Sequence, residues 1–187
     1  MKKYIYITGI IIGCFFSVIE TQAQNNVTTH NLTLGIPEVS LLATTSTGIS
    51  LTLSAAVTAG VTIEQSVSDS SAYVQFSSVI SEGSPRTLTA KYSGTMPGGT
   101  FLALKALAPN ANAIGDSGTP ITSNVTLTTS DATIVTDIGS CYSGVAADDG
   151  YKMKYTWGLD NPTVNYADVK ATAATNLTVT LTLTAAL

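Results

Sequence analysis

The residue types that perform catalysis are few in this chain and far apart. His30 is the single histidine among 187 residues. A Ser-His-Asp site needs a histidine braced by an acid and touching a serine, and no G-x-S-x-G segment surrounds any serine here. Zinc sites need several His, Cys or carboxylate ligands, and His30 and Cys141 do not make such a set. The sequence therefore predicts no catalytic residues, no zinc and no enzymatic activity.

Oxygen ligands for a hard cation occur beside one turn. Asp148 and Asp149 precede Gly150, and calcium binds carboxylate and carbonyl oxygens in loops of this kind. The segment lacks the D-x-D-x-D-G spacing of a calcium loop, and Asp and Gly also tolerate the backbone angles of ordinary turns. We expect a turn here and no cofactor, with calcium at Asp148 and Asp149 as the alternative.

Aromatic residues that could stack on a sugar gather late in the chain. Tyr151, Tyr155 and Trp157 alternate with polar residues in the segment YKMKYTW. If exposed, these rings would form a glycan-stacking surface. Aromatic rings are also the main filling of β-sandwich interiors, and the alternation favours this second role. A monomeric extracellular module that binds a glycan or calcium is therefore the alternative function.

The elements that must position these residues are predicted to be strands. Apolar and polar residues alternate with period two, and Gly, Pro and Asp-rich turns separate the runs. Such spacing predicts an all-β fold: a single antiparallel β-sandwich of immunoglobulin-like type, with about seven to nine strands. Alternating runs occupy residues 30–36, 49–53, 88–92, 102–106, 125–127, 134–138, 151–157 and 177–185.

The first residues have the pattern of an export signal. Lys2 and Lys3 precede a largely apolar run, Ile5 to Ile19, and Ala23 offers a small residue for cleavage. We therefore predict a secretory signal peptide over 1–23 and one β-sandwich domain over 24–187. The apolar run is too short to span a membrane comfortably, and no second long run follows. The mature protein is expected in the periplasm, at the cell surface or outside the cell, with no membrane span.

Charge and cysteine content narrow the partners further. After residue 23 the chain carries six basic and eleven acidic side chains, a net charge of −5. Such a surface repels phosphates, so nucleic acid is excluded as a partner. Cys141 is the one cysteine left after the leader, so no disulfide can form within the domain. We expect a buried, inert thiol, with an intermolecular disulfide as the alternative.

The segment NLTVTLTLTAAL ends the sequence, and its apolar members alternate with Thr. Nothing in it guards an exposed sheet edge, since no charge occurs from Ala171 onward. Such a strand either lies inside a sheet or receives a strand from another chain, because its backbone groups must be satisfied. The candidate residues for strand addition are Leu177, Val179, Leu181 and Leu183.

The leader, the alternating segment Val27 to Ile36, the Thr/Ser/Gly-rich body and the final LTVTLTLTA together resemble exported pilin-type subunits of Gram-negative bacteria. The resemblance is strongest to the chaperone–usher and spore-coat-U-like families. Their fold is an incomplete immunoglobulin-like sandwich that a strand from the next subunit completes. The resemblance implies a secreted or surface structural or adhesive protein, a fimbria-like subunit. Its partners would be further copies or related subunits, joined by strand addition, and a periplasmic chaperone.

Overall fold

The computed structural model describes residues 27–46 and 48–185, and the predicted signal peptide lies outside them. By its internal contacts the chain divides into two units, residues 1–35 and 36–187. The described elements are almost all strands. They are β1 (Val39–Thr44), β2 (Ser66–Val79), β3 (Arg86–Ser93), β4 (Thr100–Leu107), β5 (Ile114–Gly115), β6 (Thr119–Pro120), β7 (Val125–Thr126), β8 (Ala132–Ile138), β9 (Cys141–Tyr142), β10 (Tyr151–Leu159), α1 (Pro162–Asn165), a 3₁₀ turn (Tyr166–Asp168) and β11 (Thr178–Ala185).

The larger sheet is built around β2 and β10. Its strands run in the order β5-β9-β2-β10-β4-β7, and β1 pairs with β2 as well. Every pairing is antiparallel. In β2 the residues Ala72, Val74 and Phe76 are buried while their neighbours are partly exposed. This alternation is what a strand with one face on the core requires.

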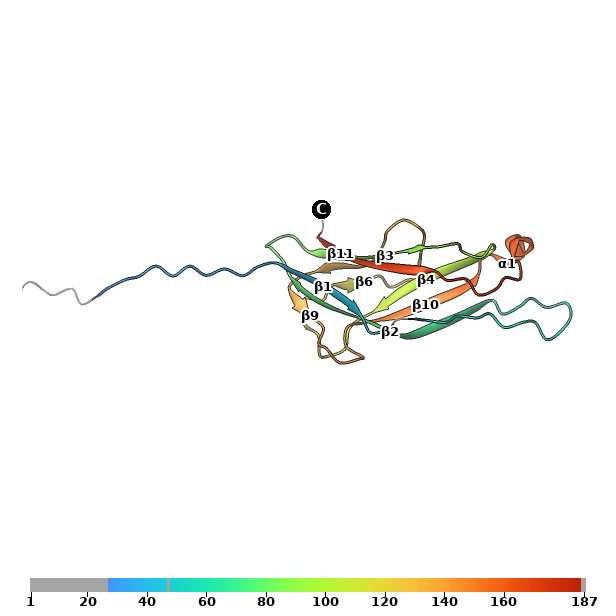
Figure 1. The fold of residues 1–187 in the computed structure, drawn as a ribbon, viewed down its shortest axis with the longest axis horizontal. Helices are drawn as coiled ribbons and strands as arrows, with labels where there is room; N and C mark the ends of the chain where they lie inside the picture. The colour runs from blue at the N-terminus through green and yellow to red at the C-terminus, as the bar shows by residue number, and fades with distance from the viewer. Residues whose placement is uncertain (1–26, 47, 186–187) are drawn as a thin grey trace, which may run out of the picture. The chain divides into compact units, whose positions relative to one another are not determined.

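The smaller sheet has the order β11-β3-β8-β6, again antiparallel throughout. Its central strand β3 buries Leu88 and Ala90 completely. Figure 1 shows β11 and β3 on one side of this unit and β1, β2, β10 and β4 on the other. The buried faces of the two sheets contribute to one hydrophobic cluster, which includes Val74, Leu104 and Ile134.

The prediction of an all-β, antiparallel fold is confirmed. The described residues form eleven strands and not the seven to nine predicted, because β5, β6, β7 and β9 are additional pairings of only two residues each. Six of the eight alternating runs overlap strands, those that begin at residues 88, 102, 125, 134, 151 and 177, although Leu127 and Leu177 lie just outside β7 and β11. The runs at 30–36 and 49–53 belong to no helix or strand, which corrects the prediction there. Alternation makes a segment suitable for a sheet edge, but a strand also needs a neighbour for its backbone groups.

The one helix in the described chain is the single turn α1, followed by the 3₁₀ turn. Pro162 starts α1, where a missing N–H costs nothing. Residues 169–177 then run without regular structure to β11. No helix in the described part is both long and apolar enough to cross a membrane.

Candidate functional site

Strand β11 forms one edge of the smaller sheet. It pairs with β3 along its whole length, from Thr178 opposite Ser93 to Ala185 opposite Arg86. Among the described residues no second strand pairs with it. The predicted strand-addition residues lie in β11 or, for Leu177, immediately before it, and their side chains face the core. Leu177, Val179, Leu181 and Leu183 are partly buried and pack against the core cluster.

The outer edge of β11 exposes backbone groups. The Ser40 hydroxyl donates to the carbonyl oxygen of Leu183, so that carbonyl points away from β3. In a strand of an antiparallel ladder, residues two apart direct their N–H and C=O groups to the same side. Val179 and Leu181 therefore present their N–H and C=O groups to the outside. No hydrogen bond to these groups from that side occurs within residues 27–46 and 48–185.

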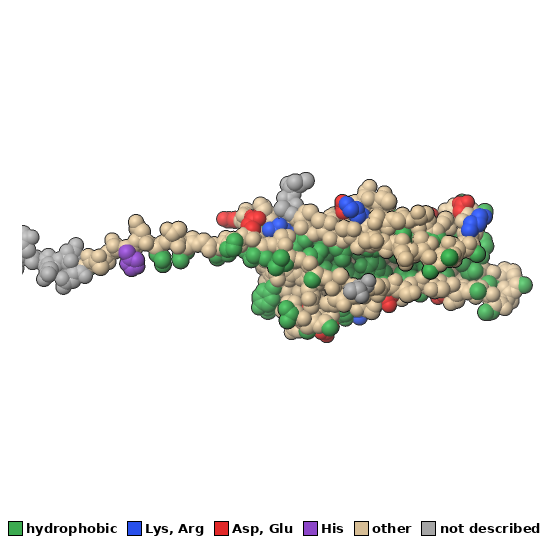
Figure 2. Space-filling view, in the orientation of Figure 1, with side chains coloured by type: hydrophobic (Ala, Val, Ile, Leu, Met, Phe, Trp, Pro, Cys, Tyr) green, Lys and Arg blue, Asp and Glu red, His purple; other side chains and the backbone are tan. Residues whose placement is uncertain are grey.

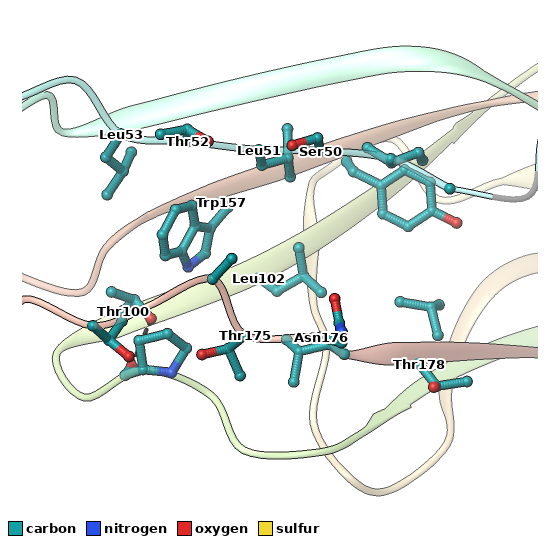
Figure 3. Close-up of a pocket in the computed structure, with 18 of the residues that line it drawn as sticks. Ser50, Leu51, Thr52, Leu53, Thr100, Leu102, Trp157, Thr175, Asn176 and Thr178 are labelled. Carbon is teal, nitrogen blue, oxygen red and sulfur yellow. Dashed lines mark hydrogen bonds between the residues drawn. The ribbon is translucent and has the colours of Figure 1, made fainter.

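A groove of about 870 Å³ runs beside this edge. Figure 2 shows hydrophobic side chains in the hollow next to β11. In Figure 3, Ser50 to Leu53 follow one side of the groove and Thr175 to Thr178 the other, with Trp157 and Leu102 between them. Most of the apolar lining comes from three places: Ile49, Leu51 and Leu53 on one rim; Leu177, Val179 and Leu181 on the other; Ala72, Leu102, Tyr155 and Trp157 between them. The remaining apolar residues of the lining are Ile63, Pro97, Val169, Ala173 and Ala174.

The groove is nearly free of charge. Lys170 is the one charged residue in its lining, and the Lys170 ammonium already donates to the carbonyl oxygen of Ala167 at 2.6 Å. A tyrosine hydroxyl is uncharged at neutral pH, and burial raises the pKa of Tyr155 further. The lining offers hydroxyl groups and apolar surface, which suit a ligand without charge.

The predicted stacking residues separate into buried and accessible positions. Tyr151 is fully buried, stacks on Phe76 with ring centroids 4.5 Å apart, and donates its hydroxyl to the carbonyl oxygen of Ser117. Tyr155 is 9% exposed. The burial of these two rings fits the core role that the alternation favoured, and Tyr151 has no exposed face for a sugar. Trp157 alone of the three is partly exposed, in the lining of the groove.

Asp148 and Asp149 have different surroundings. Asp148 is exposed, whereas Asp149 is 3% exposed. One Asp149 oxygen accepts from the side-chain amides of Asn112 at 2.8 Å and Asn110 at 3.0 Å, and the other accepts from the Ala146 N–H at 2.7 Å. These bonds, with that from Asn112 the largest cause, lower the pKa of Asp149. The carboxylate thus holds the turn together.

Metal ligation has little support in the described residues. No group of three or more His, Cys, Asp or Glu side chains comes together there. Gly150, the third residue of the predicted turn, has a φ of 93°, a conformation that glycine adopts readily. Calcium binding at Asp148 and Asp149 stays an untested alternative. The positive φ of Gly150 is consistent with the turn that we expected at this position.

Cys141 is a free thiol with 7% of its surface exposed. Burial raises the pKa of Cys141 to about 11, with a smaller contribution from the nearby charge of Asp116. A buried thiol in its protonated form is a poor nucleophile. The sulfur packs as part of the core cluster, in agreement with the inert role expected from the sequence.

Sequence reasoning missed two parts of the groove. The rim at Ile49 to Leu53 was predicted as an ordinary strand, and the segment from Thr172 to Thr175 was not predicted as part of a site. The signal for the first was its alternation, which the structure shows to be directed into the groove. The second has no apolar periodicity, because Ala and Thr in ATAATN contribute small side chains to the rim.

Comparison of the chain with models of protein families, with curated proteins and with solved structures gave no significant match.

Proposed function

We propose that this protein is an exported structural or adhesive subunit, fimbria-like in its assembly, which joins its neighbours by strand addition at the outer edge of β11. The observation that carries the proposal is the open edge itself. An uncharged, alternating strand lies at a sheet edge beside an apolar groove. Such an edge is a template for pairing with another chain unless Lys, Pro or a bulge guards it. None of these interrupts Thr178 to Thr184.

The order of strand pairing supports an immunoglobulin-like β-sandwich for this subunit. In that fold the first, second, fifth and fourth strands make one sheet, and the third, sixth and seventh make the other. With β5 to β9 set aside as an insertion, the strands here pair as β1-β2-β10-β4 and as β3-β11. The seventh position lies beside the sixth strand, which is β11. A strand donated by a neighbour would take that position.

The donor in this proposal is the segment Val27 to Ile36 of a second copy. Its Leu32, Leu34 and Ile36 alternate with polar residues, and all three are exposed. The segment contains no Asp, Glu, Lys or Arg, which suits a groove with little charge. Ten extended residues span roughly 33 Å, enough to pair with the eight residues of β11. Main-chain hydrogen bonds would supply affinity, and alternate side chains would fill the groove.

The test is the concentration dependence of association, measured by light scattering on the chain from Gln24 onward. We expect oligomers that grow with concentration. The double variant Thr178→Lys/Thr182→Lys places charges on the edge strand and should weaken association by about tenfold or more.

The matched control for that variant is Ser93→Lys/Thr89→Lys. These residues lie directly opposite Thr178 and Thr182, but on β3, which is not an edge. The control should associate as the parent does. A parent that stays monomeric at high concentration would rule out the proposal.

A second candidate, glycan binding in the same groove, has one observation in its favour. Trp157 presents a partly exposed ring in the groove, whose lining also includes Thr100, and aromatic faces with nearby hydrogen-bonding groups suit sugars. Trp157 is the one tryptophan of the chain, so its fluorescence reports directly on the groove. Glycan binding would be favoured if one member of a glycan panel quenched or shifted the Trp157 fluorescence in a saturable way while the protein itself did not associate.

A further inference from the structure

The groove has a second rim that is built like a strand but pairs with nothing in the described residues. Ile49, Leu51 and Leu53 are partly buried and line the groove, while Ser50 and Thr52 are exposed. No hydrogen bond in the described chain involves the backbone of residues 49–53. The segment therefore has the side-chain pattern of a strand without the ladder that a strand requires.

Both ends of this rim are fixed. Before it, the ladder between β1 and β2 continues to the Thr45 N–H, which donates to the carbonyl oxygen of Tyr73 at 3.0 Å. After it, Ser54 exchanges two bonds with Glu64: the Glu64 N–H donates to the Ser54 carbonyl, and the Ser54 N–H donates to the Glu64 carboxylate. The chain is thus held beside the groove on both sides of the rim, and within the described chain the backbone of residues 49–53 lacks partners.

The groove separates this rim from β11 where β1 no longer covers the edge. At Ser40, β1 lies against β11 and its hydroxyl bonds the Leu183 carbonyl. Toward Thr178 that cover ends, and the walls become Ile49 to Leu53 on one side and Leu177 to Leu181 on the other. Two alternating segments with unsatisfied edges face the same space.

We infer that residues 49–53 are a second acceptor edge, which folds into a β-strand only when a donor strand from a second copy occupies the groove. This inference rests on the proposed function, because the donor is the Val27 to Ile36 segment that pairs with β11. The donor pairs with β11 along one edge and with residues 49–53 along its other edge. Its inward side chains then meet Leu51, Leu102 and Trp157 between the two sheets.

The physical reason is the cost of an unmatched edge. A donor that bonded β11 alone would leave its own outer N–H and C=O groups beside an apolar wall, and buried unpaired groups are expensive. A ladder with residues 49–53 removes this cost. It also satisfies the backbone of a segment that has no partner in the free chain, so binding and local folding reinforce each other.

The test is hydrogen exchange, resolved by residue, on the chain from Gln24 onward under dilute and associated conditions, followed at Ile49 to Leu53 and at Val179 and Leu181. We expect both groups of amides to exchange at least about tenfold more slowly in the associated form, because each gains ladder bonds. The exposed loop around Val57 serves as the internal reference and should not change.

The two ideas fail in different ways. Slowed exchange at Val179 and Leu181 with no change at Ile49 to Leu53 overturns the second edge and leaves strand addition intact. Unchanged exchange at both places overturns the inference together with the proposed function.

Variants of the rim give an independent readout. Ile49→Asp/Leu51→Asp places charges toward the groove and should weaken association by about tenfold or more. The control Ser50→Asp/Thr52→Asp adds the same charge to the same segment at the exposed positions, and it should associate within about twofold of the parent. Equal association by both variants would contradict a strand at this rim. Urea unfolding, monitored for the monomeric variants, checks that each one is folded.

Discussion

Ser40 in β1 and Leu183 in β11 join the two sheets at one end of the molecule's open edge: the Ser40 hydroxyl donates to the Leu183 carbonyl, with 3.5 Å between the two oxygens. β1 pairs with β2 of the larger sheet over Val39 to Thr44, so it covers part of β11 while belonging to the opposite layer. The cover stops short of Thr178. This arrangement makes one edge strand half covered and half available.

The core and the groove rim should differ clearly in their contribution to stability. Leu88 is fully buried in β3, so Leu88→Ala should lower the free energy of unfolding by about 2–5 kcal/mol. Leu51 is only partly buried on the rim, and Leu51→Ala should cost about 1 kcal/mol. Urea unfolding followed by the fluorescence of Trp157 measures both. Similar losses for the two variants would mean that the rim is part of the core.

The Gly150 position should tolerate no side chain. Its φ is 93°, and a Cβ there would collide with the carbonyl oxygen of Val74 in β2. Gly150→Ala should therefore lower the free energy of unfolding by about 3 kcal/mol or more. Gly83→Ala is the control, since Gly83 has a φ of 76° with open space around it. Gly83→Ala should therefore lower the free energy of unfolding only by the cost of backbone strain, about 1 kcal/mol. Equal effects would refute the close approach to Val74.

The sequence predicted the strands whose inward residues are large and apolar. In β3, and over Tyr151 to Tyr155 of β10, the alternation of apolar residues coincides with burial. In β4 it holds for Leu102, Leu104 and Ala106, although Ala103 is buried as well. The sequence did not predict β2, the longest strand. Its first six residues, SVSDSS, contain only one apolar side chain, and the last buried position of the strand is a serine, Ser78. Those positions are strands because β10 pairs with them, and pairing between distant segments leaves no local signal.

The same limit applied to the site. Alternation in residues 177–185 predicted a strand and a choice between a central and an edge position, but not which of the two. The structure identifies the edge, because β3 pairs with β11 on one side and no strand of the described chain pairs with it on the other. Residues 49–53 show the converse, since their alternation is real but no described segment pairs with them. Side-chain pattern specifies which face is apolar, and topology decides which edges are satisfied.

Cys141 should be unreactive in the folded protein. With a pKa of about 11, roughly one thiol in a thousand is ionised at pH 8, and the sulfur is also buried. We expect a thiol reagent at pH 8 to label Cys141 at least about a hundredfold more slowly in the native chain from Gln24 onward than in urea. Rapid native labelling, or a disulfide-linked dimer that forms without unfolding, would show that the thiol is accessible.

Asp149 should make the turn before β10 sensitive to acid. Folding lowers the pKa of its carboxyl, chiefly through the Asn112 amide and then through Asn110 and the Ala146 N–H. A lowered pKa stabilises the fold at pH above the ordinary carboxyl value, and that stabilisation disappears as the pH falls through the folded value. Asp149→Asn removes the charge and one acceptor oxygen, so it should be less stable than the parent at pH 7.

The difference between the parent and Asp149→Asn should narrow as the pH falls below the ordinary carboxyl value, because the unfolded parent then binds a proton that the folded carboxylate resists. Urea midpoints at pH 7, 5 and 3 measure this convergence. Asp148→Asn is the matched control: it removes the same charge from the neighbouring residue, whose carboxylate accepts no hydrogen bond in the described chain. It should follow the parent at every pH. A gap for Asp149→Asn that stays constant from pH 7 to pH 3 would show that the ionised carboxylate does not hold the turn.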